Sequence, residues 1–148
     1  MASPSAGVVF ELLYLALTTL WLGSMAYSLV VVQPKVAKFF PDAEQREEFL
    51  VTLAHGNRRP VVALVAALVL SGGAAALTGS GTGYFIAVGL DVIAAGIFAD
   101  VSWRHWPARV FALPEELPRF RRALAVRAWT MTVLIGLSYA VALTVSLS

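Results

Sequence analysis

The sequence predicts an all-α integral membrane protein, a single antiparallel four-helix bundle over residues 1–148, from three observations. Hydrophobic residues make up 59% of the chain and charged residues 14%, whereas soluble domains carry about 25% charge. The apolar residues form four blocks, each close to the roughly 20 residues that a helix needs to cross a bilayer. Cysteine is absent, which excludes disulfides and thiolate metal sites. The net charge of only +2 gives no reason to expect a nucleic-acid partner.

Four spanning helices are expected at about 8–32, 60–78, 84–103 and 124–147. The first contains one charged residue, Glu11. It should end before Pro34, because proline lacks an N–H and clashes with the preceding turn of a helix. The second begins at Pro60, and proline is favoured in a first helical turn. It ends in the glycine-rich run at 79–83, which predicts a tight turn into the third helix.

The basic residues predict the orientation of the bundle. All eleven fall on the side reached after the first and third helices: Lys35, Lys38, Arg46, Arg58, Arg59, Arg104, Arg109, Arg119, Arg121, Arg122 and Arg127. By the positive-inside rule we expect both long loops to be cytoplasmic and both termini to be extracytoplasmic. Arginine outnumbers lysine, as is typical of GC-rich genomes, so we expect the plasma (inner) membrane of a bacterium.

A short cytoplasmic helix is expected over 43–56, between the first two spanning helices. Asp42 precedes it and is a typical N-cap residue. Phe49, Leu50 and Leu53 share one face of this helix, so we expect it to lie along the lipid headgroups or to pack beneath the bundle.

Arginines cluster in the loop before the fourth helix and just inside that helix. The four residues are Arg119, Arg121, Arg122 and Arg127. We expect them to determine topology and to contact anionic lipid headgroups. The alternative is that they dock an acidic partner or a phosphorylated ligand.

The second helix carries a packing signal, because small residues recur on it every four positions. They are Ala63, Ala67, Ser71, Ala75 and Gly79. Such a stripe lets another helix come close where lipid removes the hydrophobic drive for association. We expect a helix of this chain to occupy it, and another subunit is the alternative.

The third helix places two acids in or near the membrane, Asp91 and Asp100. A charge at bilayer depth costs about 2.5–3.5 kcal/mol on insertion scales, so each acid needs a partner, a proton or water. Asp100 precedes Arg104 by four residues, which predicts an ion pair. Asp91 lies nine residues earlier, on the opposite face of the helix.

The helical rise of about 1.5 Å per residue places Asp91 level with hydroxyl-bearing residues of the other three helices. They are Tyr14, Ser71, Ser138 and Tyr139. Asp91 is therefore either a neutral or hydrogen-bonded clasp between helices, or a proton or ligand site. Glu11 lies near the outer boundary and is interpreted as structural.

Further candidates lie at the cytoplasmic ends of the helices. His55, Asn57, Arg58 and Trp106 would line the mouth of a membrane-embedded enzyme. His55 and His105 fall on the same side, so a shared metal or haem site is conceivable, but no metal-ligand motif accompanies them. We therefore predict no metal and no cofactor.

Several short motifs carry a family resemblance. They are Trp21-Leu22-Gly23-Ser24, Tyr27 and Val32-Gln33-Pro34 in the first helix, His55-Gly56-Asn57-Arg58-Arg59-Pro60 before the second, and Arg127-Ala128-Trp129 at the fourth. Together they resemble the anthrone-oxygenase-like group of small four-helix membrane proteins, and the pattern is also similar to CopD-type copper-resistance membrane domains. The first resemblance implies metal-free oxidation of a lipophilic aromatic substrate, and the second implies copper handling.

Four functional hypotheses follow. The leading one is a non-catalytic subunit or accessory component of a larger membrane assembly, with membrane lipids and other subunits, or a second copy, as partners. The alternatives are a membrane-embedded enzyme acting on a lipophilic substrate, a proton-coupled carrier using Asp91 or Glu11, and a haem or metal protein.

Overall fold

A computed structural model describes residues 5–148, and this part of the chain is all-helical. In chain order its elements are α1 (Ala6–Tyr27), η1 (Ser28–Val32), α2 (Gln33–Phe39), α3 (Ala43–Ala75), η2 (Ala76–Ser80), α4 (Thr82–Asp100), η3 (Val101–His105), α5 (Trp106–Val110), η4 (Pro114–Glu116) and α6 (Leu117–Leu147). They combine into four segments, each long and apolar enough to cross a membrane. The prediction of an all-helical fold with four helices of spanning length is confirmed.

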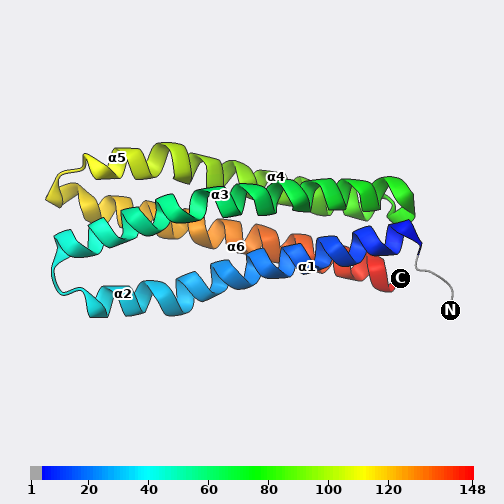
Figure 1. The fold of residues 1–148 in the computed structure, drawn as a ribbon, viewed down its shortest axis with the longest axis horizontal. Helices are drawn as coiled ribbons and strands as arrows, with labels where there is room; N and C mark the ends of the chain where they lie inside the picture. The colour runs from blue at the N-terminus through cyan, green and yellow to red at the C-terminus, as the bar shows by residue number, and fades with distance from the viewer. Residues whose placement is uncertain (1–4) are drawn as a thin grey trace.

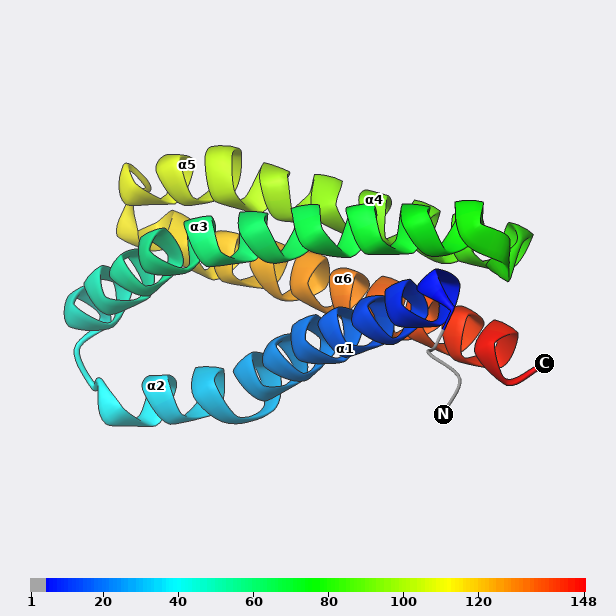
Figure 2. The same cartoon turned by 45° about the vertical axis from the view of Figure 1, so that its right-hand side comes forward.

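The four segments lie side by side, and each runs in the direction opposite to the one before it (Figure 1). The loops at 40–42 and 111–113 lie at one end, which we call the charged end because the eleven basic residues lie in that part of the bundle. The start of α1, the turn after η2 and the end of α6 lie at the other. Helix α4 packs mainly on α6, and α1 on α3 and α6. Figure 2 shows α1 crossing the bundle at an angle, with α2 set apart from α5.

The first helical segment is longer than predicted, because it does not stop before Pro34. It continues through η1 and α2 to Phe39. Proline clashes with the backbone carbonyl four residues earlier in a regular α-helix. Here the wider π-helical turn η1 directly precedes it, and the N–H of Gln33 bonds to the carbonyl of Ser28, five residues back. The π-turn therefore changes the backbone spacing where the proline enters, and the helix goes on.

The predicted separate helix over 43–56 is wrong, because these residues form the first part of α3. Its start is as expected: the carboxylate of Asp42 accepts hydrogen bonds from the N–H groups of Glu44 and Gln45. The helix then passes through Gly56 and Pro60 without ending. Packing explains the continuation, since Leu50 is buried among α2, η3 and α5 and anchors this part of α3 to the bundle.

The tight turn predicted at 79–83 is present and depends on glycine. Gly79 and Gly81 have φ values of 132° and 71°, a region that residues with a Cβ rarely adopt. Together they reverse the chain between η2 and α4.

The core has a large and a small part. The large one fills the bundle around Tyr14, Trp21, Leu68 and Ile135, and the small one lies at the charged end around Trp106. Helices α1 and α4 pack closely on α3 at Gly72, where an added Cβ would lie 2.7 Å from the Tyr14 ring and 2.5 Å from Val88 Cγ2. A side chain at this position would have to displace Tyr14 or Val88.

The small-residue stripe of α3 is divided between the core and the outside. Ser71 and Ala75 are buried, whereas Ala63, Ala67 and Gly79 are exposed. Only the middle of the stripe is therefore covered within this chain.

Candidate functional site

Asp91 of α4 lies in a fully buried polar cluster with Tyr14 of α1 and Ser138 of α6. The Tyr14 hydroxyl donates a hydrogen bond to Asp91 Oδ2, and Ser138 Oγ donates to the same oxygen at 2.9 Å. Tyr14 Oη and Ser138 Oγ are themselves 2.6 Å apart. Two of the four residues predicted at this level thus contact the acid. The cluster joins three helices.

The other two predicted neighbours have different surroundings. The Ser71 hydroxyl donates to the carbonyl of Leu68 in its own helix, at 3.0 Å, and Tyr139 is half-buried on another face of α6. Both donors to Asp91 converge on Oδ2, so Oδ1 is buried without a hydrogen-bond partner. A buried carboxylate oxygen in this state is costly unless a proton or another donor joins it.

A second polar cluster at the charged end is built on Glu47 of α3. Arg109 of α5 donates two hydrogen bonds to its carboxylate, at 2.8 and 2.9 Å, and Arg121 of α6 adds another at 2.9 Å. Arg109 is 3% exposed, and its guanidinium lies 4.9 Å from the centre of the Trp106 ring. The sequence pattern does not distinguish Glu47 from the other acids in the first turns of this helix.

Asp100 forms a third cluster nearby. Its predicted partner Arg104 is 3.8 Å away, while Arg127 of α6 lies closer, at 3.2 Å. Arg127 also donates to His105 Nδ1 at 3.0 Å. Arginine has no acceptor atom, so Nδ1 must accept and Nε2 must hold the ring proton. That buried Nε2 has no hydrogen-bond partner.

The four arginines predicted to contact headgroups therefore differ in their surroundings. Arg121 and Arg127 are half-buried and paired with Glu47 and Asp100. Arg119 and Arg122 are exposed. A headgroup role for the exposed pair stays a prediction.

The residues predicted at an enzyme mouth lie in separate environments. His55 and Asn57 are exposed, and His55 Nδ1 lies 3.0 Å from the Val51 carbonyl of its own helix. Trp106 is buried beneath Arg109. Among residues 5–148, no group of three or more His, Cys, Asp or Glu side chains is placed to hold a metal ion. The two histidines that could have shared a metal or haem differ in their surroundings, because His55 is exposed and His105 is buried.

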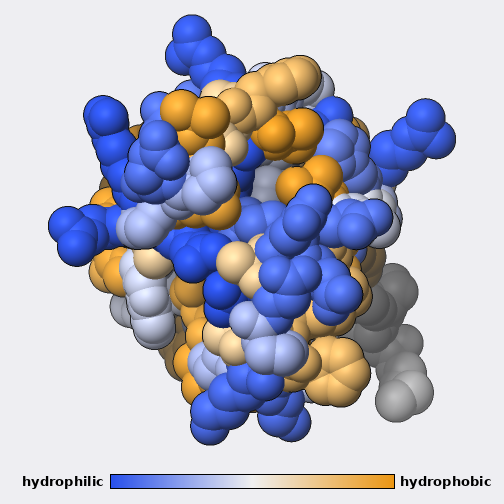
Figure 3. Space-filling view, turned by 90° about the vertical axis from the view of Figure 1, so that its left-hand side faces the viewer, coloured by the Kyte–Doolittle hydropathy of each residue, from blue (hydrophilic) through white to orange (hydrophobic). Residues whose placement is uncertain are grey.

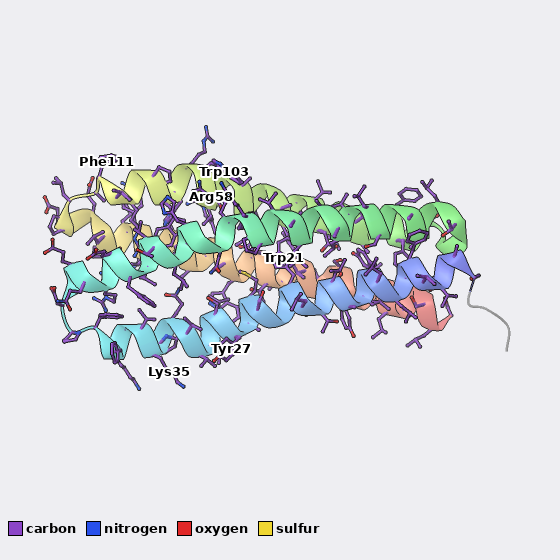
Figure 4. All side chains as sticks on the ribbon, viewed as in Figure 1. Trp21, Tyr27, Lys35, Arg58, Trp103 and Phe111 are labelled. Carbon is purple, nitrogen blue, oxygen red and sulfur yellow. The ribbon has the colours of Figure 1, made fainter. Side chains whose placement is uncertain are left out.

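Arg58 has a specific structural contact, because it donates a hydrogen bond to the backbone carbonyl of Ser102. The N–H of Trp106 bonds instead to Val101 in the π-turn η3, and the next residue, Pro107, has no N–H. The Arg58 guanidinium takes the place of this missing donor. It also lies 5.1 Å from the centre of the Trp103 ring, and the two side chains are neighbours in Figure 4.

An open aromatic pocket, which the sequence analysis did not predict, lies between α2 and the start of α3. Its volume is about 550 Å³, and Lys35, Val36, Lys38, Phe39, Phe40 and Phe49 line it. The Phe40 ring centre lies 5.0 Å from that of Phe39 and 5.2 Å from that of Phe49, and Phe39 is 77% exposed. Figure 3 views this charged end and shows hydrophobic groups among the hydrophilic ones.

Comparison with known proteins gives no relative: no family model, no curated protein and no solved structure matches the chain. The anthrone-oxygenase-like and CopD-like resemblances therefore stay predictions.

Proposed function

We propose that the protein is a non-catalytic accessory component of a larger membrane assembly, and that a partner docks in its aromatic pocket. In this proposal the bundle spans the plasma (inner) membrane of a bacterium, with the charged end in the cytoplasm and both termini outside. The observation that carries it is an exposed aromatic pocket whose α3 side lies about ten residues beyond the charge-free run of that helix.

The depth of the pocket follows from the helical rise. On α3, the charge-free run begins after Arg59, and Phe49 lies ten residues before that point. At about 1.5 Å per residue, Phe49 is about 15 Å beyond the hydrocarbon boundary. The headgroup layer is about 5–7 Å thick on each side. The α3 side of the pocket therefore faces water in this proposal unless a protein covers it, whereas the α2 side begins at Lys35, the first charge after the apolar run of α1.

The lining of the pocket indicates the chemistry of the partner. Three phenylalanine rings supply an apolar surface, and aromatic residues contribute strongly at protein interfaces. Lys35 and Lys38 lie at its edge, and in Figure 4 the labelled Lys35 side chain points away from the bundle. An apolar segment that carries acidic residues is complementary to this surface.

An enzyme with its mouth at the charged end has less support. Arg58 and Trp106 are held in structural contacts with Ser102 and Arg109, and His55 and Asn57 are exposed. A proton-coupled carrier is a second candidate, because Asp91 is buried in the spanning part of α4 with Oδ1 unpartnered. Its test is the Asp91 variant pair discussed below.

Site-specific photocrosslinking in cells tests the docking proposal. A benzophenone amino acid replaces Phe39 or Phe49 in the pocket, and the matched control replaces Phe85, an exposed phenylalanine near the start of α4. We expect a discrete protein adduct from the two pocket positions and not from Phe85. Charge reversal by Lys35→Glu with Lys38→Glu should reduce that adduct. Lipid adducts alone at Phe39, or the same adduct at Phe85, would contradict the proposal.

A further inference from the structure

A groove runs along the outside of the bundle between α4 and α6, near the charged end. Its volume is about 450 Å³, and it is open to the outside of the bundle. Ile93, Gly96 and Ile97 of α4 and Val126 of α6 form its apolar part, and Asp100 and Arg127 lie at one end. None of these residues belongs to the aromatic pocket.

The apolar part of the groove is open along one glycine. A Cβ built on Gly96 would meet no atom within 4 Å, while the flanking Ile93 and Val126 are exposed and form walls. Thr130 also lines the groove, but its hydroxyl donates to the carbonyl of Val126 at 2.8 Å in its own helix. The groove is therefore apolar from Ile93 as far as Asp100.

The polar end of the groove, at Asp100 and Arg127, has an excess of positive charge once Arg104, which lies beside Asp100 and not in the lining of the groove, is included. Arg127 and Arg104 both pair with Asp100, at 3.2 and 3.8 Å, so two cations share one carboxylate. The Arg104 side chain is 85% exposed, which leaves its guanidinium free to bind another anion. Asp100 is the last residue of α4 and Arg104 follows in η3, directly after the apolar run, where we expect the phosphate groups of the bilayer.

We infer that this groove binds one anionic phospholipid, with an acyl chain along Gly96 and the phosphate at Arg104 and Arg127. An apolar channel that ends in excess positive charge matches a molecule with one hydrocarbon chain beside one phosphodiester. Guanidinium groups bind phosphate through paired hydrogen bonds. A zwitterionic lipid fits less well, because its headgroup brings an ammonium toward the same two arginines.

Native mass spectrometry of the whole protein from mild detergent tests the site with dioleoyl-phosphatidylglycerol and dioleoyl-phosphatidylcholine as probes. We expect one phosphatidylglycerol molecule to be retained in preference to phosphatidylcholine. Gly96→Leu fills the groove and should abolish this retention. The matched control is Gly23→Leu on α1, where an added Cβ also meets nothing within 4 Å, and it should retain the lipid as the wild type does.

Arg104→Gln gives a second variant that does not alter the apolar channel. It should weaken phosphatidylglycerol retention about fivefold, the effect of about one basic residue near a membrane surface, and leave phosphatidylcholine unchanged. Equal retention by Gly96→Leu and the wild type would overturn the site. So would equal retention of the two lipids, or binding of soluble glycerophosphoglycerol as tight as that of the full lipid. A change in oligomeric mass for Gly96→Leu alone would assign the groove to a protein helix instead.

Discussion

Arg109 binds Glu47 through two parallel hydrogen bonds of 2.8 and 2.9 Å, although the two residues lie 62 positions apart in the chain. The pair fixes the start of α3 against α5, and Arg121 extends it to α6. This is the main polar link among the helices at the charged end.

Glu47→Gln should destabilise the bundle, because it leaves the buried Arg109 without its counter-charge. Removing one partner of a fully buried pair costs about 3–5 kcal/mol. Arg121 is partly exposed, so we expect about 2–3 kcal/mol. Thermal unfolding in detergent measures the loss. Glu44→Gln, at an exposed position in the same turn, is the control and should unfold with the wild type. Matching melting curves for both variants would show that the pair contributes nothing.

Asp91 variants separate a structural clasp from a proton site. Asp91→Asn keeps the size and the hydrogen-bonding ability of the side chain but removes the titratable proton, and Asp91→Leu removes both. A clasp predicts that Asn keeps the fold and the biological function while Leu destabilises. A carrier predicts that Asn abolishes transport with the fold intact. If the Asp91→Leu variant has the stability and the function of the wild type, Asp91 is neither a clasp nor a proton site.

Hydroxyl variants provide the control within this cluster. Tyr14→Phe removes a donor to Asp91 and should cost about 0.6–1.7 kcal/mol, the range of interhelical hydrogen bonds in membranes. Ser71→Ala removes an equally buried hydroxyl that bonds only within its own helix, so it should have a smaller effect.

Two adjacent glycines of α3 should respond oppositely to alanine. At Gly72 the new Cβ would press on Tyr14 and Val88, at 2.7 and 2.5 Å, and overpacking of this kind costs about 1–3 kcal/mol. At Gly73 it would meet nothing within 4 Å, so Gly73→Ala should be neutral or stabilising by up to about 1 kcal/mol. Unfolding in detergent compares the two. Equal stability would mean that α3 can move away from α1 at little cost.

Reporter fusions test the proposed orientation. Because the basic residues lie at one end of the bundle, we expect alkaline phosphatase fused after Ser148 to be active and a cytoplasmic reporter at that point to be inactive. Fusions in the loop at 111–113 should give the reverse. An inactive phosphatase together with an active cytoplasmic reporter at the C-terminus would place both termini inside.

The sequence predicts best the properties that belong to a single helix, such as its length and the level of each residue along it. Hydropathy predicts the four spanning segments, and the constant rise of a helix predicts that Tyr14, Ser138 and Asp91 lie at one level. It did not reveal which hydroxyls turn toward the acid: Ser71 bonds to its own helix instead. That choice depends on how the helices are rotated about their axes, which hydropathy does not fix.

Features that depend on distant contacts were missed. Glu47 is one of several acids in an early helical turn, and only the packing of α5 and α6 distinguishes it. The aromatic pocket was missed because the first helix was expected to end before Pro34. Pro34 is compatible with a continuous helix here because a π-turn precedes it. No simple sequence pattern predicts such a turn.

The π-turn η3 also determines where the side chains after it point. A π-turn contains one residue more than an α-helical turn spanning the same height, and one residue corresponds to about 100° of rotation around the axis. Arg109 faces Glu47 with this additional residue between Asp100 and Trp106. Deletion of one residue from Val101–His105 should restore regular α-helical spacing and turn the end of the helix to another direction. The length of this segment is therefore constrained more tightly than the identity of most of its residues.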